Sequence, residues 1–309
     1  MNYENKTSLF EAVYFFNKSL CHKENKYPIK LSPHESKETK MHTSIYSAMM
    51  RILVVSEMIE NKETYFFLRQ DHKVKHEKIM QTILKMSSIE NYHDLYDKST
   101  RKNQFFFDHI SEAEDQIYCK CNFNITYESG QVINQHIRFN KGKILELGGN
   151  SGGLATAILK ENNLCEYTIV DRKIPCMIGN EYKAINDVEL SFIDQDIFNL
   201  KLADNKYDYI IIMNLLHDFN DRDCQNILKN CLKYCHTKTN FIIIEDILIS
   251  DYKPRDAIMY GLRLSVECQG GKQRSKDEFK DMFSKINYEI KEDIRLSNVH
   301  GMLIFNEIE

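Results

Sequence analysis

The sequence predicts an α/β protein with a doubly wound, mostly parallel sheet in its C-terminal part and a mostly helical N-terminal part. From residue 143 onward, short apolar runs alternate with segments of helical period, as in parallel strands joined by helices. The first apolar run ends in a glycine-rich loop, and the next two end in acids. Because ligands bind at the carboxyl ends of such strands, these features predict a ligand site at one edge of the sheet.

Seven strands are expected in the C-terminal part. Five strands of parallel type are residues 144–147, 167–170, 189–193, 207–213 and 240–248. Two further strands, residues 288–294 and 302–305, have no helical segment between them, so we expect a hairpin that closes the sheet. A dehydrogenase usually continues in βαβ units, so the terminal hairpin favours another class of nucleoside-binding fold.

Composition excludes several functional classes. The chain has 309 residues, 42% of them hydrophobic, which is long enough for two globular domains. A formal net charge of −4 gives no electrostatic reason to expect nucleic acid. The longest apolar runs, residues 209–216 and 241–244, fall well short of the roughly 20 residues that a bilayer requires, and no secretory signal is visible.

The cysteines predict thiols in a reducing compartment. Their number is nine, their spacing is irregular, and no signal peptide precedes them, which together favour a cytoplasmic protein. Two groups resemble metal ligands, Cys119 with Cys121, and Cys231 with Cys235 and His236. A structural zinc site needs four convergent ligands, and Cys231 and Cys235 are expected to be neighbours on one helix, so no metal is expected.

The glycine-rich loop follows the first strand. It begins after Glu146 and contains Gly148, Gly149, Gly152 and Gly153. Glycines let the backbone turn sharply and approach a ligand closely, and the helix expected over residues 154–160 points its N-terminus at the same position. The loop therefore predicts a nucleoside-cofactor site, and its geometry suits NAD and S-adenosylmethionine alike.

The loop sequence favours S-adenosylmethionine. A dinucleotide fingerprint requires glycine two residues after Gly148, where this chain has Asn150, which can adopt a positive φ but breaks the match. Glu146, two residues before the first glycine, would face the ammonium of the cofactor's amino-acid portion, whereas a carboxylate would repel a pyrophosphate.

Acids follow the next two strands. Asp171 ends the second strand, one βα unit beyond the loop, where a carboxylate can accept both hydroxyls of a ribose. After the third strand, Asp196 can accept from an adenine amino group, Phe198 can cover the ring, and Ile197 lies between them. These residues extend the expected cofactor site along the sheet edge.

A histidine follows the fourth strand. His217 lies where ligands bind in open α/β folds, and a pKa near 6.5 suits an imidazole to remove a proton from a hydroxyl. An isolated histidine is usually structural, but this position favours a general base.

These motifs resemble those of the winged-helix, class I S-adenosylmethionine-dependent small-molecule O-methyltransferases, of the caffeic acid and acetylserotonin type. The resemblance covers residues 140–309 and is carried by Leu-Gly-Gly at 147–149, Asp-Ile-Phe at 196–198, Leu-His-Asp-Phe-Asn-Asp at 216–221, Ile-Ile-Glu-Asp at 243–246 and Gly-Gly-Lys-Gln-Arg-Ser at 270–275. It implies a seven-stranded doubly wound Rossmann-like methyltransferase sheet. In the N-terminal third only the layout matches.

By the resemblance, His217 is the general base and Glu245 is the carboxylate that orients its imidazole. Plant members have a glutamate where this chain has Gln273, which can hold a hydrogen bond but supplies no charge. A lysine near the adenosine is replaced by Met213, so cofactor contact there would be apolar, and Asn214 follows it.

The acceptor is expected to be a small secondary metabolite. By the resemblance, the helix at residues 256–268 lines the acceptor site through Met259, Tyr260, Leu264 and Cys268, although such spacing is equally typical of core. Aromatic residues of the N-terminal half are compatible with an aromatic or polyketide-like acceptor and also with a dimer core.

The N-terminal part is expected to be mostly helical, over residues 8–21, 42–61 and 74–86, with an aromatic strand at 64–69. This order resembles a winged helix, a fold that either binds DNA or forms dimers. Residues 47–62 are apolar where a DNA-recognition helix would be basic, and Glu57, Glu60 and Glu63 lie in or beside them, which favours burial against a partner subunit over contact with phosphate. We therefore expect a winged-helix-like dimerisation and substrate-covering domain at 1–135, a methyltransferase domain at 136–309, and a homodimer.

Two other functions remain open from the sequence. The same fold and cofactor could support carbon or nitrogen methylation, hydroxylation, decarboxylation or pericyclic chemistry, since Gln273 departs from the family pattern. Alternatively, the chain could be a winged-helix regulator whose α/β domain senses a metabolite, which predicts salt-dependent DNA binding.

Overall fold

The computed structural model describes residues 30–31, 51, 59–62, 65–68, 107, 110–139, 141–203, 206–250, 253–268 and 271–308. The chain divides into two compact units. The first consists of residues 1–108, 217–220 and 247–275, and the second of residues 109–216, 221–246 and 276–309. The predicted division at residue 135 stays a prediction, because most of the preceding part lies outside the described residues.

The described N-terminal strands form a small antiparallel sheet. Strands β1 (Lys30–Leu31), β3 (Tyr65–Leu68) and β2 (Ile59–Lys62) lie side by side in that order. The aromatic strand expected at 64–69 is thereby confirmed as β3. The end of the helix expected at 42–61 is wrong, because Ile59 pairs with Leu68 across the sheet and the backbone is extended there. The helices expected at 8–21 and 74–86 lie outside the described residues.

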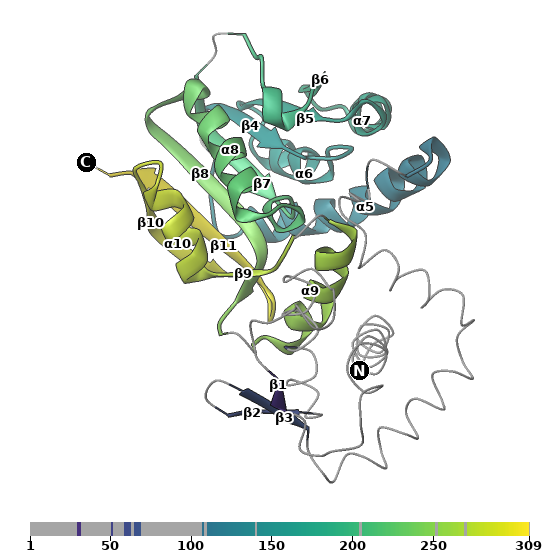
Figure 1. The fold of residues 1–309 in the computed structure, drawn as a ribbon. Coiled ribbons are helices and arrows are strands. Elements are labelled where there is room, and N and C mark those ends of the chain that lie inside the picture. Colours follow the sequence, from purple (N-terminus) through teal and green to yellow (C-terminus); the bar gives the residue numbers. More distant parts are fainter. Residues whose placement is uncertain are drawn as a thin grey trace. The chain divides into compact units, whose positions relative to one another are not determined.

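The second unit is built on the predicted doubly wound sheet, which Figure 1 shows with its helices. The strand order is β10-β11-β8-β7-β4-β5-β6, and a two-residue strand, β9, pairs with the end of β8 at Ile247 and Leu248, which the division assigns to the first unit. The strands are β4 (Lys143–Leu147), β5 (Glu166–Asp171), β6 (Leu190–Asp194), β7 (Tyr207–Met213), β8 (Cys235–Leu248), β9 (Arg274–Ser275), β10 (Tyr288–Arg295) and β11 (His300–Glu307). β4 to β8 are parallel, and β11 runs antiparallel to β8 and β10, which confirms the terminal hairpin.

Strand β8 differs from the prediction at its start. It begins at Cys235, which pairs with Tyr207 of β7, five residues before the expected start at residue 240. The expectation that Cys231 and Cys235 share a helix is wrong, because helix α8 (Asp221–Cys231) ends at Cys231. Residues 236–240 are polar and carry no strand pattern, so only pairing with the neighbouring strand extends β8.

Helices cover both faces of the sheet. α5 (Glu112–Ile133), α6 (Gly153–Glu161) and α7 (Lys173–Asn186) pack together on one face, and the ring of Phe123 on α5 meets Tyr182 on α7 edge to face at 4.6 Å. α8 and α10 (Lys276–Ser284) lie on the other face (Figure 1), where Phe283 packs on Phe241 of β8. The main core lies between α6 and the sheet and includes Ile144, Leu154, Ile158, Ile211 and Ile242. Among the described residues, no helix is long and apolar enough to span a bilayer.

Helices α5 and α6 approach each other through glycines. A Cβ at Gly153 would lie 2.2 Å from the carbonyl oxygen of Phe123 and 2.3 Å from Oγ1 of Thr126. A Cβ at Gly130 would lie 2.6 Å from the Cβ of Ala157, whose carbonyl accepts a hydrogen bond from Asn134 Nδ2 at 2.9 Å. The absence of side chains at these two positions therefore sets the distance between α5 and α6. Helix α6 begins at the glycine loop.

This contact gives a stability prediction. Gly153→Ala should lower the free energy of unfolding by about 1–3 kcal/mol, because the new methyl group meets backbone that cannot move without shifting α5. Urea denaturation followed by circular dichroism measures the change. Gly261→Ala in helix α9 (Arg255–Glu267) is the control, since a Cβ there meets nothing within 4 Å and should leave stability equal or slightly raised. Equal stability of the Gly153→Ala variant and the parent would contradict the prediction.

Candidate functional site

The carboxyl ends of four neighbouring strands bring the predicted cofactor residues to one edge of the sheet. In the order β7-β4-β5-β6, these ends carry Asn214, Gly148, Asp171 and Asp196. The residues are spread over more than 60 positions of the sequence, and parallel pairing alone aligns them. The edge predicted from the sequence therefore exists within the second unit.

The glycine loop depends on left-handed backbone at three positions. Gly148 has φ of 68°, Asn150 of 50° and Gly152 of 84°. The expectation that Asn150 can adopt a positive φ is confirmed, and its side-chain oxygen accepts the N–H of Ser151 at 2.8 Å. Gly148 donates its N–H to the carbonyl of Val170, so the loop is attached to β5 as it leaves β4.

Glu146 lies beneath this loop and is almost wholly buried, with 2% of its surface exposed. Its Oε2 accepts a hydrogen bond from the Tyr167 hydroxyl at 2.9 Å. Burial raises the pKa of Glu146 to about 8, although the bond from Tyr167 acts in the opposite direction. Gly149 packs directly on this carboxyl, because a Cβ there would lie 2.7 Å from its Cδ.

Asp171 connects the loop to the end of β5. One oxygen accepts the N–H of Asn150 at 2.7 Å, and the other accepts the N–H of Arg172 at 2.7 Å. The residue is 9% exposed, and burial raises the pKa of Asp171, against these two bonds. Each oxygen still has a second lone pair, so the carboxylate can accept two hydroxyl groups while keeping its backbone bonds.

Asp196 caps the short 3₁₀ helix η4 (Ile197–Asn199). Its two oxygens accept from the N–H of Phe198 at 2.9 Å and from Asn199 Nδ2 at 2.8 Å. The carbonyl of Phe198 accepts from Asn230 Nδ2 of α8 at 2.6 Å. Asp196 is exposed, and Ile197 and Phe198 are half-buried, so their side chains remain partly accessible beside the end of β6.

The end of β7 holds Met213 and Asn214. Met213 is 6% exposed and belongs to the core under α6. Asn214 has φ of 48°, donates its N–H to the carbonyl of Ile244 at 2.9 Å, and has its Oδ1 3.2 Å from His300 Nε2. His300 is the first residue of β11, and no motif in the sequence singles it out.

Glu245 holds the backbone that leads to His217. It is fully buried, and its Oε1 accepts the N–H groups of Leu215 at 3.1 Å and Leu216 at 3.0 Å. The carboxylate thus determines the path of the chain directly before the histidine. The contact predicted between Glu245 and the His217 imidazole stays a prediction.

His217 lies in the 3₁₀ turn η5 (Leu216–Asp218), and its Nε2 is 3.5 Å from Asp218 Oδ1. The ring of Tyr260 on α9 meets the His217 ring edge to face, with centroids 6.4 Å apart. Gly271 packs against the same turn, since a Cβ there would lie 2.4 Å from the His217 carbonyl oxygen. The first unit therefore surrounds the predicted base with an aromatic ring on one element and a glycine on another.

The segment that includes Gln273 also contacts this turn. Arg274 is 1% exposed and donates from Nη2 to the carbonyl of Phe219 at 2.7 Å. Gln273, next to it, is 3% exposed. On α9, Leu264 and Cys268 are buried and Tyr260 is 37% exposed, whereas the side chain of Met259 lies outside the described part.

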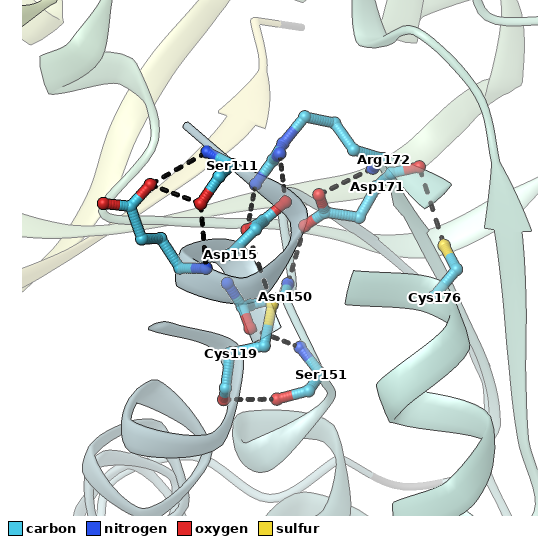
Figure 2. Close-up of polar contacts among 9 residues, drawn as sticks. Ser111, Asp115, Cys119, Asn150, Ser151, Asp171, Arg172 and Cys176 are labelled. Carbon is cyan, nitrogen blue, oxygen red and sulfur yellow. Dashed lines mark hydrogen bonds and ion pairs between the residues drawn. The ribbon is translucent and has the colours of Figure 1, made fainter. Parts of the chain in front are cut away.

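Two residues beside the candidate site were not expected from the sequence. Figure 2 shows Asp115 of α5 in a two-bond ion pair with Arg172, directly beside Asp171. Asp115 gives no sequence signal, because it is one of several acids in the first turn of α5. Arg172 could have been noticed from its position directly after the predicted ribose acid, Asp171. In the described ranges, no three His, Cys, Asp or Glu side chains converge on a metal site, and the cysteines are thiols.

Comparison with known proteins assigns the family. The sequence profile of the O-methyltransferase domain matches residues 80–289, more than half of the chain, so this chain belongs to the O-methyltransferase domain family. Bovine acetylserotonin O-methyltransferase (Bos taurus) is 27% identical over 162 residues, 51% of this chain and 45% of that enzyme. Isoflavone 7-O-methyltransferase of Glycyrrhiza echinata is 27% identical over 189 residues, 58% of this chain and 50% of that enzyme. The chain thus aligns with about half the length of these relatives.

Solved structures share the fold. An O-methyltransferase family 2 protein from Planctomyces limnophilus, in complex with apigenin, has a TM-score of 0.82 at 13% identity, covering 98% of this chain and 94% of that chain. Human N-acetylserotonin methyltransferase, in complex with SAM, has a TM-score of 0.62 at 16% identity, also covering 98% and 94%. At these identities the likeness concerns the fold, and it confirms the Rossmann-like methyltransferase sheet.

The raised pKa of Glu146 predicts a pH dependence of stability. Between the ordinary carboxyl pKa near 4.5 and about 8, the folded protein keeps a proton that the unfolded chain has lost. Stability should therefore fall as pH rises through this window, by at most about 1.4 kcal/mol per pH unit, and level off above it. Glu146→Gln removes the effect and keeps an acceptor for Tyr167, so its melting temperature should exceed the parent's increasingly from pH 5 to 8.

Thermal unfolding of both proteins at several pH values provides the test. Glu128→Gln, at an exposed acid of α5, is the control and should follow the parent at every pH. Parallel profiles for Glu146→Gln and the parent would mean that Glu146 is ionised in the folded protein.

Proposed function

We propose that this protein is an S-adenosylmethionine-dependent O-methyltransferase that acts on a hydroxyl group of a small aromatic or polyketide-like metabolite. The observation that carries the proposal is the pair of buried acids at the loop, Glu146 beneath it and Asp171 hydrogen-bonded to it, in a chain of the O-methyltransferase domain family.

The residues at the sheet edge fit this cofactor. Glu146 supplies an acceptor for an ammonium, Asp171 has lone pairs for two ribose hydroxyls, and Phe198 is partly accessible for an adenine ring. Gly148 and Gly152 keep the loop backbone free of side chains on its left-handed turns. An anionic diphosphate would instead meet two carboxyl groups, which supports the sulfonium cofactor over NAD.

The cofactor supplies the methyl group as an electrophile. In this proposal His217 accepts the proton of the acceptor hydroxyl, and the turn that carries it owes its shape to the bonds from Leu215 and Leu216 to Glu245. Tyr260, edge to face with His217, offers an aromatic surface to a planar acceptor. Most of the acceleration would come from alignment of the two reactants.

An aromatic acceptor is supported by the relatives. The Planctomyces limnophilus protein was solved with apigenin, and an O-methyltransferase from neocarzinostatin biosynthesis was solved with SAM and a hydroxy-methyl naphthoic acid. Both ligands are planar and hydroxylated, so hydroxylated aromatics are the first acceptors to screen. A homodimer formed through residues 1–135 and a cytoplasmic location belong to the same proposal.

A second function keeps the cofactor and changes the reaction. Gln273, buried in the segment that contacts the His217 turn, brings no charge where plant members have a glutamate. Carbon or nitrogen methylation, or a reaction without methyl transfer, is therefore an alternative. Stoichiometric formation of S-adenosylhomocysteine with a methyl ether product would exclude it.

Calorimetric titration with S-adenosylmethionine and S-adenosylhomocysteine tests the cofactor. The parent should bind both, and Asp171→Ala should lose binding because the ribose hydroxyls lose their acceptor. Asp187→Ala, at the end of α7, is the control and should bind as the parent does. Failure of the parent to bind either compound would reject the methyltransferase proposal and favour a metabolite-sensing regulator.

Replacement of His217 tests the general base. His217→Ala should slow methyl transfer by about 10²–10⁴-fold while leaving the affinity for S-adenosylhomocysteine nearly unchanged. Turnover of a hydroxylated aromatic acceptor, measured by S-adenosylhomocysteine release, gives the rate. His136→Ala, at an exposed histidine after α5, serves as the control. Parent-like turnover of His217→Ala would assign the proton acceptor to another group.

A further inference from the structure

An ion pair joins α5 to the residue that follows the predicted ribose acid. Arg172 Nη1 lies 2.6 Å from Asp115 Oδ2, and Arg172 Nη2 lies 2.9 Å from Asp115 Oδ1. Asp115 is 2% exposed, so its charge is buried, while the Arg172 side chain is 38% exposed. Two parallel hydrogen bonds between a guanidinium and a carboxylate fix both the distance between the two side chains and their relative orientation. We refer to the two residues as the clasp.

Arg172 of the clasp belongs to the same short segment, residues 171–172, that binds the glycine loop. Arg172 uses its side chain for Asp115 and its backbone N–H for Asp171, whose other oxygen accepts from Asn150. On the other side of the loop, Ser151 Oγ donates to the carbonyl of Cys119, one turn along α5 from Asp115, at 2.9 Å. Figure 2 shows these contacts surrounding Asp171. Helix α5 is thus joined to Arg172, directly after Asp171, and to Ser151 of the glycine loop.

We propose that the clasp is a positioning pair that holds Asp171 and the glycine loop in the geometry that receives the cofactor's ribose. Asp115 and Arg172 would then determine the affinity for the ribose hydroxyls without touching them. This inference rests on the proposed function, since it concerns how the same site reaches its binding geometry.

Charge explains why either half of the clasp matters. Asp115 and Asp171 are both buried acids close enough to Arg172 to feel its positive charge, and without that charge the two carboxylates would repel each other. Without the charge of Asp115, the guanidinium of Arg172 would be left next to Asp171, whose lone pairs the ribose needs. Loss of one partner therefore harms the site more than loss of both.

Titration with S-adenosylhomocysteine tests the clasp in the full-length protein. Asp115→Asn and Arg172→Gln should each weaken binding by about tenfold or more, because each leaves one charge uncompensated. The double variant Asp115→Asn/Arg172→Gln should recover most of that loss, since neither charge remains. Arg138→Gln, which removes the exposed pair of Arg138 with Glu161, is the matched control and should bind as the parent does.

A second ligand separates positioning from general destabilisation. The 2′-deoxyribose analogue of S-adenosylhomocysteine should bind the parent more weakly than the natural compound, and this difference should shrink in Asp115→Asn. If the clasp had only a structural role, Asp115→Asn would lower the affinity for both ligands by the same factor. Should Asp115→Asn fail to fold, Arg172→Lys, which keeps the charge and loses the paired bonds, should show the same reduced difference.

The outcomes are distinct. If the parent binds S-adenosylhomocysteine and the clasp variants bind it equally well, or lose both ligands to the same extent, the clasp is structural only and the inference is wrong. If the parent binds neither ligand, the cofactor proposal itself fails and the inference fails with it.

Discussion

The buried carboxylate of Asp171 is the interaction on which the carboxyl edge of the sheet depends. Its two oxygens accept one N–H from the loop after β4 and one from the turn after β5, so two strand ends that could vary separately are held together. The loop reaches this carboxylate only because Asn150 adopts a left-handed backbone between two glycines that do the same. Arg172 then extends the connection to α5, a helix that the glycine contacts at Gly130 and Gly153 already hold close to α6.

The carboxylate of Glu245 binds backbone N–H groups of the loop after β7 in the same manner. Glu245 is fully buried and accepts the backbone N–H groups of Leu215 and Leu216. In both loops a buried acid satisfies amide groups that would otherwise lack partners, which is favourable enough to keep a charge-bearing group in the interior. In each of these two loops a buried acid thus sets the path of the backbone, and His217, the predicted base, directly follows the second pair of bonds along the chain.

Most of the C-terminal fold could be predicted because its strands are apolar and its turns contain glycines and acids. β7 matches the expected 207–213, and the other apolar strands differ by one or two residues at most of their ends. The exceptions are informative. β8 begins in a polar segment, and β2 occupies residues read as the end of a helix, because in both cases pairing with a neighbouring strand overrides local pattern. The winged-helix reading of residues 1–135 stays a prediction.

The sequence by itself determined which residues lie at the edge of the sheet, since Glu146, Asp171, Asp196 and Asn214 each lie at or within two residues of the end of a strand whose apolar pattern is local. Only the tertiary structure decided what these residues contact. Asp115 meets Arg172 across 57 positions, and Asn214 meets His300 across 86. Such pairs arise from the packing of a helix and a late strand onto the sheet edge, and a single sequence carries no periodic signal for contacts between elements so far apart.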